Sequence, residues 1–218
     1  MKIAILGAEC TGKTTLIQAL AAALELRGQS ALCISETLRE WCDAHGRTPL
    51  AHEQILIAHT QAQRVLQAPL CDVLLVDTTP LMTAIYSDIV LSDASLYPFA
   101  LAHHGVYDLV LLTGLDLPWV ADGIQRDGKA MQHQIDARLR EILQGHGLHF
   151  SVVYGSAENR CSSAMAAIDQ CAAQRASGPT PRPSDQPRWQ WTCEKCSDAQ
   201  CEHHLFTTLL ASTTAQHP

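Results

Sequence analysis

The spacing G-x-x-x-x-G-K-T, from Gly7 to Thr14, constrains the fold of this chain more than any other feature. An apolar run at residues 3–6 precedes it, and a helical pattern at residues 15–26 follows it. A glycine-rich turn between a strand and a helix is the setting of a phosphate-binding loop, whose backbone N–H groups point into one concavity. The partial positive charge at the start of the helix also favours an anion there. We therefore expect the loop to hold the phosphates of a nucleoside triphosphate, rather than to be a chance glycine-rich turn.

Each residue type in the loop suits this chemistry. The Lys13 ammonium can reach the β- and γ-phosphates, and the Thr14 hydroxyl can ligate Mg²⁺. Gly7 and Gly12 allow a close backbone approach that a Cβ atom would block. ATP and Mg²⁺ are therefore the expected cofactors. The loop residues predicted to bind the nucleotide are Gly7, Ala8, Glu9, Cys10, Thr11, Gly12, Lys13, Thr14 and Thr15.

The composition favours a folded domain over a binding tail or a membrane protein. With 218 residues, 47% of them apolar and 17% charged, the chain can bury a core in one α/β domain with a short appendage. A net charge of −7 argues against general nucleic-acid binding, which needs a basic surface. Charged or polar residues interrupt every apolar run, so we expect no membrane span. Because the chain starts directly with a strand pattern and shows no secretory leader, we expect a cytoplasmic protein.

Short apolar runs alternate with longer helical patterns, which is typical of a parallel sheet wrapped by helices. The expected strands are residues 2–6, 31–35, 73–77, 109–113 and 149–154. The expected helices are residues 13–27, 38–44, 52–67, 94–103, 129–144 and 157–173. They predict an α/β domain over residues 1–174, a doubly wound sheet that binds ligands beyond the carboxyl ends of its strands. A proline-rich linker at residues 175–188 and a Cys/His-rich tail at residues 189–218 follow this domain.

Polar residues follow two of the predicted strands at the edge of the sheet where the loop lies. Asp77 ends an apolar strand, and we expect it to face Mg²⁺ or the attacking hydroxyl. The alternative for Asp77 is a carboxylate that caps a turn. Glu36 and Arg39, just past the second strand, can orient a polar substrate through hydrogen bonds. Their alternative is a capping glutamate and a solvated helical arginine.

A polar, glycine-bearing stretch at residues 116–128 follows the fourth strand, where a closing lid would lie. Phosphoryl transfer spreads negative charge over the equatorial oxygens, and an arginine from a lid stabilises that charge. Arg126 is the first choice for this role. Arg138 and Arg140 are helical alternatives that can also be simply solvated.

Four stretches of the chain occur together in an ordered combination: residues 7–15, 36–39, 77–86 (DTTPLMTAIY) and 118–126 (PWVADGIQR). Together they resemble the ribosylnicotinamide kinase family, which includes the kinase domain of the bifunctional regulator of NAD biosynthesis and related small AAA-type ATP-binding proteins. The resemblance covers residues 1–173. It implies a P-loop NTPase of the nucleoside- or nucleotide-kinase type, with strand order 2-3-1-4-5. It also implies transfer of the ATP γ-phosphoryl group to a ribose hydroxyl of nicotinamide riboside or a similar nucleoside.

The resemblance also implies roles by position. Asp77 would be the base or the metal partner beside ATP·Mg²⁺, Arg126 the lid arginine, and Arg160 part of an adenine-side loop. The residues near the substrate would be Glu36, Arg39, Thr78 and Asp122. The matching stretches include no adenylyltransferase or DNA-binding module, and the aromatic side chains that could stack on a nicotinamide are Trp41, Tyr86 and Trp119.

Two other functions are compatible with a phosphate loop. A regulatory ATPase or nucleotide switch would use nucleotide occupancy to control a protein partner docked on the tail. A nucleic-acid-linked factor would use the Cys/His cluster, and the acidic net charge counts against it although Arg175, Arg182 and Arg188 make the linker locally basic. An ATP-dependent kinase with a small nucleoside-like acceptor remains the leading expectation.

The tail carries a cluster of metal-ligating residue types. Cys193-x-x-Cys196 can bring two thiolates onto one metal, and Cys201 with His203 or His204 can complete a tetrahedral Zn²⁺ site. Such a site would be structural, because four protein ligands leave no open position. A redox C-x-x-C pair and an unstructured tail are the alternatives. A zinc-bound tail would offer a surface for a protein partner or for self-association.

The zinc hypothesis has a direct test. We expect about one zinc ion per chain in the purified protein, and a reduced zinc content in both Cys193→Ser and Cys196→Ser, because each substitution removes one of the four ligands. Elemental analysis measures this content. Unchanged zinc in both variants would remove the hypothesis.

Overall fold

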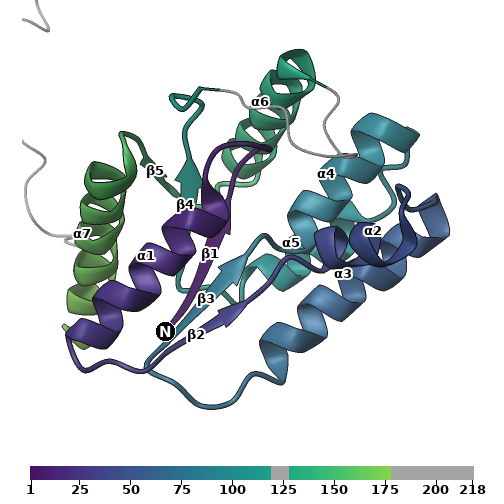
Figure 1. The fold of residues 1–218 in the computed structure, drawn as a ribbon. Coiled ribbons are helices and arrows are strands. Elements are labelled where there is room, and N and C mark those ends of the chain that lie inside the picture. Colours follow the sequence, from purple (N-terminus) through teal and green to yellow (C-terminus); the bar gives the residue numbers. More distant parts are fainter. Residues whose placement is uncertain (119–127, 178–218) are drawn as a thin grey trace, which may run out of the picture. The chain divides into compact units, whose positions relative to one another are not determined.

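Five parallel strands form the centre of the domain in a computed structural model that describes residues 1–118 and 128–177 (Figure 1). The strands are β1 (Lys2–Leu6), β2 (Ala31–Ile34), β3 (Val73–Asp77), β4 (Leu109–Thr113) and β5 (Ser151–Val153). Their order across the sheet is β2-β3-β1-β4-β5. The helices are α1 (Lys13–Leu26), α2 (Thr37–His45), α3 (Ala51–Leu66), α4 (Pro80–Leu91), α5 (Tyr97–His104), α6 (Lys129–Gly145) and α7 (Ala157–Ala176).

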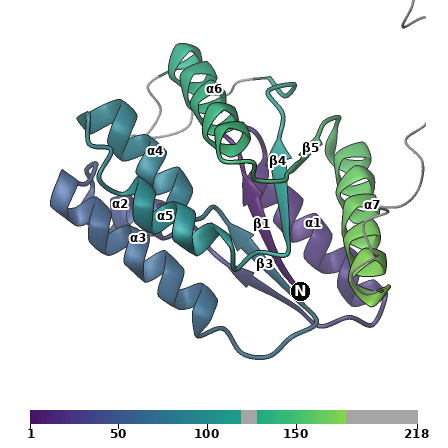
Figure 2. The same ribbon diagram turned by 180° about the vertical axis from the view of Figure 1, so that it is seen from behind.

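The helices cover both faces of the sheet, and Figures 1 and 2 show the two sides. Side chains of a strand alternate between its faces. Ile3 and Ile5 of β1 therefore pack on one face with residues of α1 and α7. Ala4 and Leu6 of the same strand pack on the other face with residues of α3 to α6. Because both faces are buried, the strands are apolar almost throughout, as the sequence predicted.

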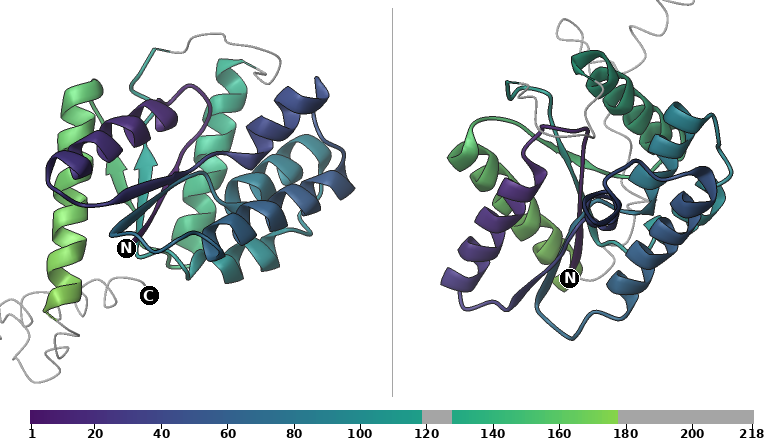
Figure 3. Two further views of the ribbon diagram at one scale, coloured as in Figure 1. Left: turned by 60° about the horizontal axis from the view of Figure 1, so that its bottom comes forward. Right: turned by 45° about the vertical axis from the view of Figure 1, so that its right-hand side comes forward.

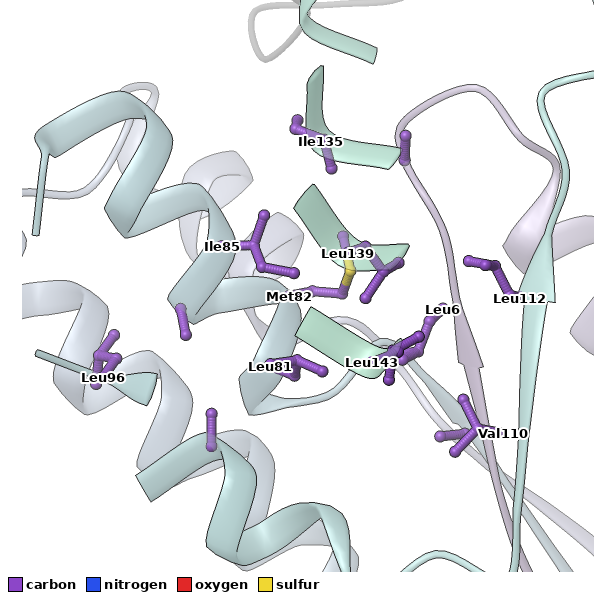
Figure 4. Packing of buried hydrophobic residues seen from close by; sticks show 14 of the residues in the cluster. Leu6, Leu81, Met82, Ile85, Leu96, Val110, Leu112, Ile135, Leu139 and Leu143 are labelled. Atoms are coloured by element: carbon purple, nitrogen blue, oxygen red, sulfur yellow. The ribbon is translucent and has the colours of Figure 1, made fainter. Parts of the chain in front are cut away.

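The larger of the two hydrophobic clusters lies on the face covered by α3 to α6, and apolar side chains from α4 and α6 form much of it (Figure 4). Leu6 and Leu112, from adjacent strands, are fully buried there. The α4 and α6 side chains that meet them are Leu81, Met82, Ile85, Ile135, Leu139 and Leu143. This packing fixes α4 and α6 on the sheet, and both helices begin at the edge where the strands end (Figure 3).

The strand order 2-3-1-4-5 and the α/β architecture expected from the sequence are confirmed. Helix α4 was missing from the expected helices. Residues 80–85 are all buried, so the helix lacks the polar stripe that makes an amphipathic pattern visible. Its start is nevertheless marked, because the Thr79 hydroxyl accepts a hydrogen bond from the Leu81 amide at 3.2 Å and Pro80 occupies the first turn.

Several predicted boundaries were wrong by a few residues. The strand expected at 149–154 is Ser151–Val153, and the helix expected at 94–103 is Tyr97–His104. Helix α7 continues to Ala176, beyond its predicted end at residue 173. Among the described residues, no helix combines the length and the apolar character needed to cross a bilayer.

The packing of α4 predicts a large loss of stability on truncation of Ile85. This side chain is fully buried, so Ile85→Ala removes methyl groups and leaves a cavity. We expect the free energy of unfolding to fall by about 3 kcal/mol. Val90→Ala on the same helix is the control, because Val90 is 49% exposed and should change stability much less. Urea titration followed by circular dichroism measures both values, and similar losses in the two variants would contradict this packing.

Candidate active site

The phosphate loop joins β1 to α1 at the carboxyl end of the sheet, and its conformation requires glycine at two positions. Gly12 is the N-cap of α1 with a φ of 75°, in the left-handed region. Gly7 has a φ of 147°, and a Cβ atom there would lie 2.1 Å from the Thr113 hydroxyl of β4. Thr113 is fully buried and donates to the Leu6 carbonyl at 3.1 Å. A side chain at either glycine would therefore strain or displace the loop.

Lys13 brings a cation into this loop. Its side chain is only 6% exposed, and its Nζ donates to the Ala8 carbonyl at 2.8 Å. The Thr11 hydroxyl donates to the same carbonyl at 2.7 Å. An ammonium has three N–H donors, so the bond to Ala8 leaves donors for phosphate oxygens.

Asp77 lies at the end of β3, next to the start of α1. Its Oδ2 accepts a hydrogen bond from the Thr14 hydroxyl at 2.7 Å. The carboxylate is 5% exposed, and its Oδ1 has no hydrogen-bond partner among the described residues. A buried carboxylate oxygen without a partner is costly unless a cation or a donor completes it. A hydroxyl and a carboxylate are also the hard oxygen ligands that Mg²⁺ prefers, so this pair fits the expected metal. Since Thr79 caps α4, Asp77 is not the cap of that helix.

Glu36 approaches the same place from the end of β2. It occupies the N-cap position of α2, but its side chain makes no capping hydrogen bond. Burial is the main cause that raises the pKa of Glu36, and the nearby Asp77 carboxylate raises it further. Lys13 and Arg39 oppose this shift, and the Arg39 guanidinium lies 3.5 Å from the Glu36 carboxylate. Glu36 is thus a poorly solvated carboxylate beside Lys13 and Asp77, with a raised affinity for a proton.

Tyr86 of α4 adds an aromatic hydroxyl to this group. Burial raises its pKa well above the ordinary value, and the Glu9 and Glu36 carboxylates add to the shift. A hydrogen bond between Tyr86 and the Glu9 side chain contributes in the same direction. Glu9 of the phosphate loop therefore faces α4. The sequence placed Glu9 only among the phosphate-binding residues, because nothing in the motif shows which way this side chain points.

Thr78 and Gln61 hold the backbone at the end of β3. Thr78 is 4% exposed and has a φ of 63°, which is unusual for a β-branched residue. Gln61 of α3 lies 3.4 Å from the carbonyls of both Asp77 and Thr78, and its Oε1 accepts from the Thr37 amide at 2.9 Å. This link between α2, α3 and β3 was not predicted. The signal available in the sequence was Gln61 itself, a polar residue on the buried face of α3.

Arg160 of α7 lies under the phosphate loop. It is 2% exposed, donates to the Thr11 carbonyl and forms an ion pair with Asp116. Asp116 also accepts a hydrogen bond from the Gly155 amide at 2.6 Å. Arg160 therefore supports the backbone of the loop from outside. Its predicted contact with the nucleotide remains a prediction.

The other predicted site residues are not brought together by the described part of the chain. Arg138 is paired with Asp88 at 2.9 Å, and Arg140 with Asp136 at 2.7 Å, so both are engaged away from the loop. The predicted residues Asp122, Arg126, Cys193, Cys196, Cys201, His203 and His204 lie outside the described residues. Within residues 1–118 and 128–177 there is no cluster of three His, Cys, Asp or Glu side chains able to hold a metal.

The sequence of residues 2–160 matches an AAA domain family. The match spans the phosphate loop, the Thr14–Asp77 pair, Glu36 and Arg160. The chain belongs to this AAA domain family. Among curated proteins, no sequence matches the chain.

Solved structures similar to this AAA domain include two of NadR proteins. One, a complex with NR, has a TM-score of 0.66 and 19% sequence identity, over 79% of this chain and 51% of that one. The other, a complex with NAD and AMP-PNP, has a TM-score of 0.64 and 19% identity, over 79% of this chain and 49% of that one. This chain therefore spans about half the length of those NadR chains.

A deoxyadenosine kinase from M. mycoides, with the products dCMP and dCDP, is also similar. Its TM-score is 0.51 at 16% identity, over 79% of this chain and all of that one. Identities this low establish the fold and not the activity. The AAA domain described here thus has the P-loop nucleoside-kinase fold that the sequence predicted.

The raised pKa of Glu36 predicts a pH-dependent stability penalty. Between its unfolded pKa, about 4.3, and the raised value, the folded protein binds more protons than the unfolded chain, so stability falls as pH rises through this window. Glu36→Gln removes the penalty. We expect the variant to exceed the native protein in stability more at pH 8 than at pH 4.

Urea titrations at the two pH values measure this difference. Glu40→Gln on the same helix is the matched control, because hydrogen bonds from Ser35 and Arg64 lower the pKa of Glu40. Its expected effect has the opposite sign, a loss of stability that is larger at pH 8. An effect of Glu36→Gln that does not change with pH would contradict the proposed environment of Glu36.

Proposed function

We propose that this protein is an ATP-dependent kinase that transfers the γ-phosphoryl group to a hydroxyl of a nucleoside, with nicotinamide riboside as the first candidate. The observation that carries the proposal is the Thr14–Asp77 hydrogen bond beside Lys13, with the second oxygen of Asp77 buried and unpartnered among the described residues. This arrangement suits a polyphosphate and its metal. A second polar group, built from Glu9, Glu36 and Tyr86, adjoins it and suits an acceptor.

Different residues would bind the phosphates, hold the metal and accept the proton. Backbone amides of the loop and Lys13 would bind the β- and γ-phosphates, and Thr14 with Asp77 would hold Mg²⁺, which neutralises charge on the phosphates when bound. The acceptor hydroxyl oxygen attacks the γ-phosphorus, the bond from that phosphorus to the β–γ bridging oxygen breaks, and ADP leaves. Glu36 would take the hydroxyl proton, because burial raises its pKa and makes its carboxylate more basic, whereas Asp77 would hold Mg²⁺ together with Thr14.

The polar group of Glu9, Glu36 and Tyr86 favours an acceptor with a cationic or strongly polar ring. Glu9 and Glu36 supply two carboxylates, and Lys13 and Arg39 are the cations that act on Glu36. The Tyr86 ring can pack against an aromatic base. Trp41 is less suited, since it stacks on His45 at 4.0 Å and carries the Arg47 guanidinium over its ring. The similar NadR structure was solved with NR, which supports testing nicotinamide riboside first.

Three further assignments remain part of the proposal. Arg126 would stabilise charge on the transferred group, and Asp122 would contact the acceptor or the metal. The Cys/His-rich tail at residues 189–218 would bind zinc and serve as a docking element. The alternative function is a regulatory ATPase acting on a protein partner, which the AAA domain match also permits.

The test is ADP release from ATP and Mg²⁺ with and without a panel of nucleosides. We expect one nucleoside to stimulate ADP release strongly and to appear as a monophosphate in the mass spectrum. Slow hydrolysis that no nucleoside changes would contradict the kinase and favour the regulatory ATPase. Lys13→Ala should lower either activity by at least about a hundredfold, because the loop loses its phosphate-binding cation. Lys2→Ala, at the opposite end of β1, is the control and should keep full activity.

A further inference from the structure

Carbonyl oxygens of the phosphate loop are bonded by side chains from distant parts of the chain. Arg160 of α7 donates to the Thr11 carbonyl of the loop, and Thr113 of β4 donates to the carbonyl of Leu6, the last residue of β1 before the loop. Gln132, in the first turn of α6, donates through its Nε2 to the Glu9 carbonyl at 2.7 Å. Gln132 is 2% exposed, so this contact is shielded from water. None of these donors belongs to the sequence motif of the loop.

A bond to a carbonyl also sets the direction of the next amide. In a planar trans peptide the C=O and N–H point in opposite directions, and the described chain has no cis peptide bonds. Because the Glu9 carbonyl is directed at α6, the Cys10 N–H must point away from α6. Helix α6 packs on one face of the sheet and α1 on the other, so this amide is directed away from the α6 face. Backbone amides on this side are the groups that would meet phosphate oxygens.

The conformation of Cys10 shows why this peptide needs external support. Cys10 has a φ of 56°, in the left-handed region that residues with a Cβ atom disfavour. Rotation of the Glu9–Cys10 peptide by roughly a half turn would bring Cys10 to the favoured negative φ region. It would also turn the Glu9 carbonyl oxygen toward the phosphate side, where it would repel an anion. The hydrogen bond from Gln132 opposes this rotation.

We propose that Gln132 is a positioning residue for the triphosphate: it keeps the Glu9–Cys10 peptide turned so that its amide, and not its carbonyl, faces the phosphates. The inference rests on the proposed binding of a nucleoside triphosphate at the loop. It does not depend on which acceptor is phosphorylated.

The test is the affinity for AMP-PNP with Mg²⁺, measured by calorimetry on the full chain. Gln132→Met keeps the length of the side chain and removes the donor, and we expect about a tenfold higher Kd. Gln132→Glu replaces the donor with an acceptor oxygen and should raise Kd further. Gln134→Met is the control, because Gln134 is exposed on the same helix. Its Kd should equal that of the native protein.

Thermal unfolding separates positioning from a purely structural role. If Gln132→Met lowers the unfolding temperature but leaves Kd unchanged, the inference is overturned. Should Gln132→Met not fold, Gln132→Glu, which keeps the side-chain volume and helix propensity, decides in its place. Absence of AMP-PNP binding by the native protein would overturn the proposed function and this inference with it, whereas equal Kd values in native and variant proteins would overturn this inference alone.

A double-mutant cycle tests the peptide orientation itself. Glycine adopts a positive φ without penalty, so Cys10→Gly removes the force that favours rotation of the peptide. We therefore expect the loss of affinity caused by Gln132→Met to be smaller in a Cys10→Gly background than in the native one. An equal loss in both backgrounds would show that Gln132 does not act through this peptide.

Discussion

The parallel pairing of β1 with β3 is the constraint on which the candidate site depends. The register places Ile5 opposite Asp77, so the phosphate loop and the carboxylate leave the sheet at the same edge. The hydrogen bond from Thr14 to Asp77 then closes the gap between the loop and the neighbouring strand. A shift of this register would move Asp77 away from Thr14 or carry its carboxylate into the buried, apolar part of the sheet, which is unfavourable. The apolar core therefore positions two polar groups that are 63 residues apart in sequence.

Several charged and polar side chains are buried at this edge, which is unfavourable for the protein alone. The carboxylates of Glu36 and Asp77 lie near each other and are only partly offset by Lys13 and Arg39. Such an arrangement is expected where a ligand supplies the missing partners, because a bound metal and phosphates change the electrostatic balance. The surrounding helices keep these groups in place. Gln61 joins the ends of β3 and α2, and Arg160 supports the loop from below.

Much of the fold could be predicted, and the omissions share a physical cause. Helices α1, α3 and α6 have one buried and one exposed side, so their periodicity was visible. Helix α4 contacts α3, α5 and α6, so every side chain from Pro80 to Ile85 is buried and this part of the helix shows no amphipathic period. Local patterns also missed part of the candidate site. Asp77 follows directly from the end of a strand, whereas Gln61 and Gln132 act through contacts with residues far away in sequence.

The sequence by itself predicted the phosphate loop and the α/β architecture, because both follow from local patterns: the motif from Gly7 to Thr14 and the alternation of apolar strands with helical patterns. The strand order was implied by the family resemblance. Only the tertiary structure decided which side chains from other elements form hydrogen bonds with the backbone at the loop. Gln132 and Arg160 each bond a loop carbonyl, and Thr113 bonds the carbonyl of Leu6 just before the loop. No local spacing in the sequence indicates these contacts. The physical reason is that a phosphate loop needs its carbonyls bonded elsewhere while its amides face the ligand. Those partners can come from any element that the packing brings near, so only the packed domain identifies them.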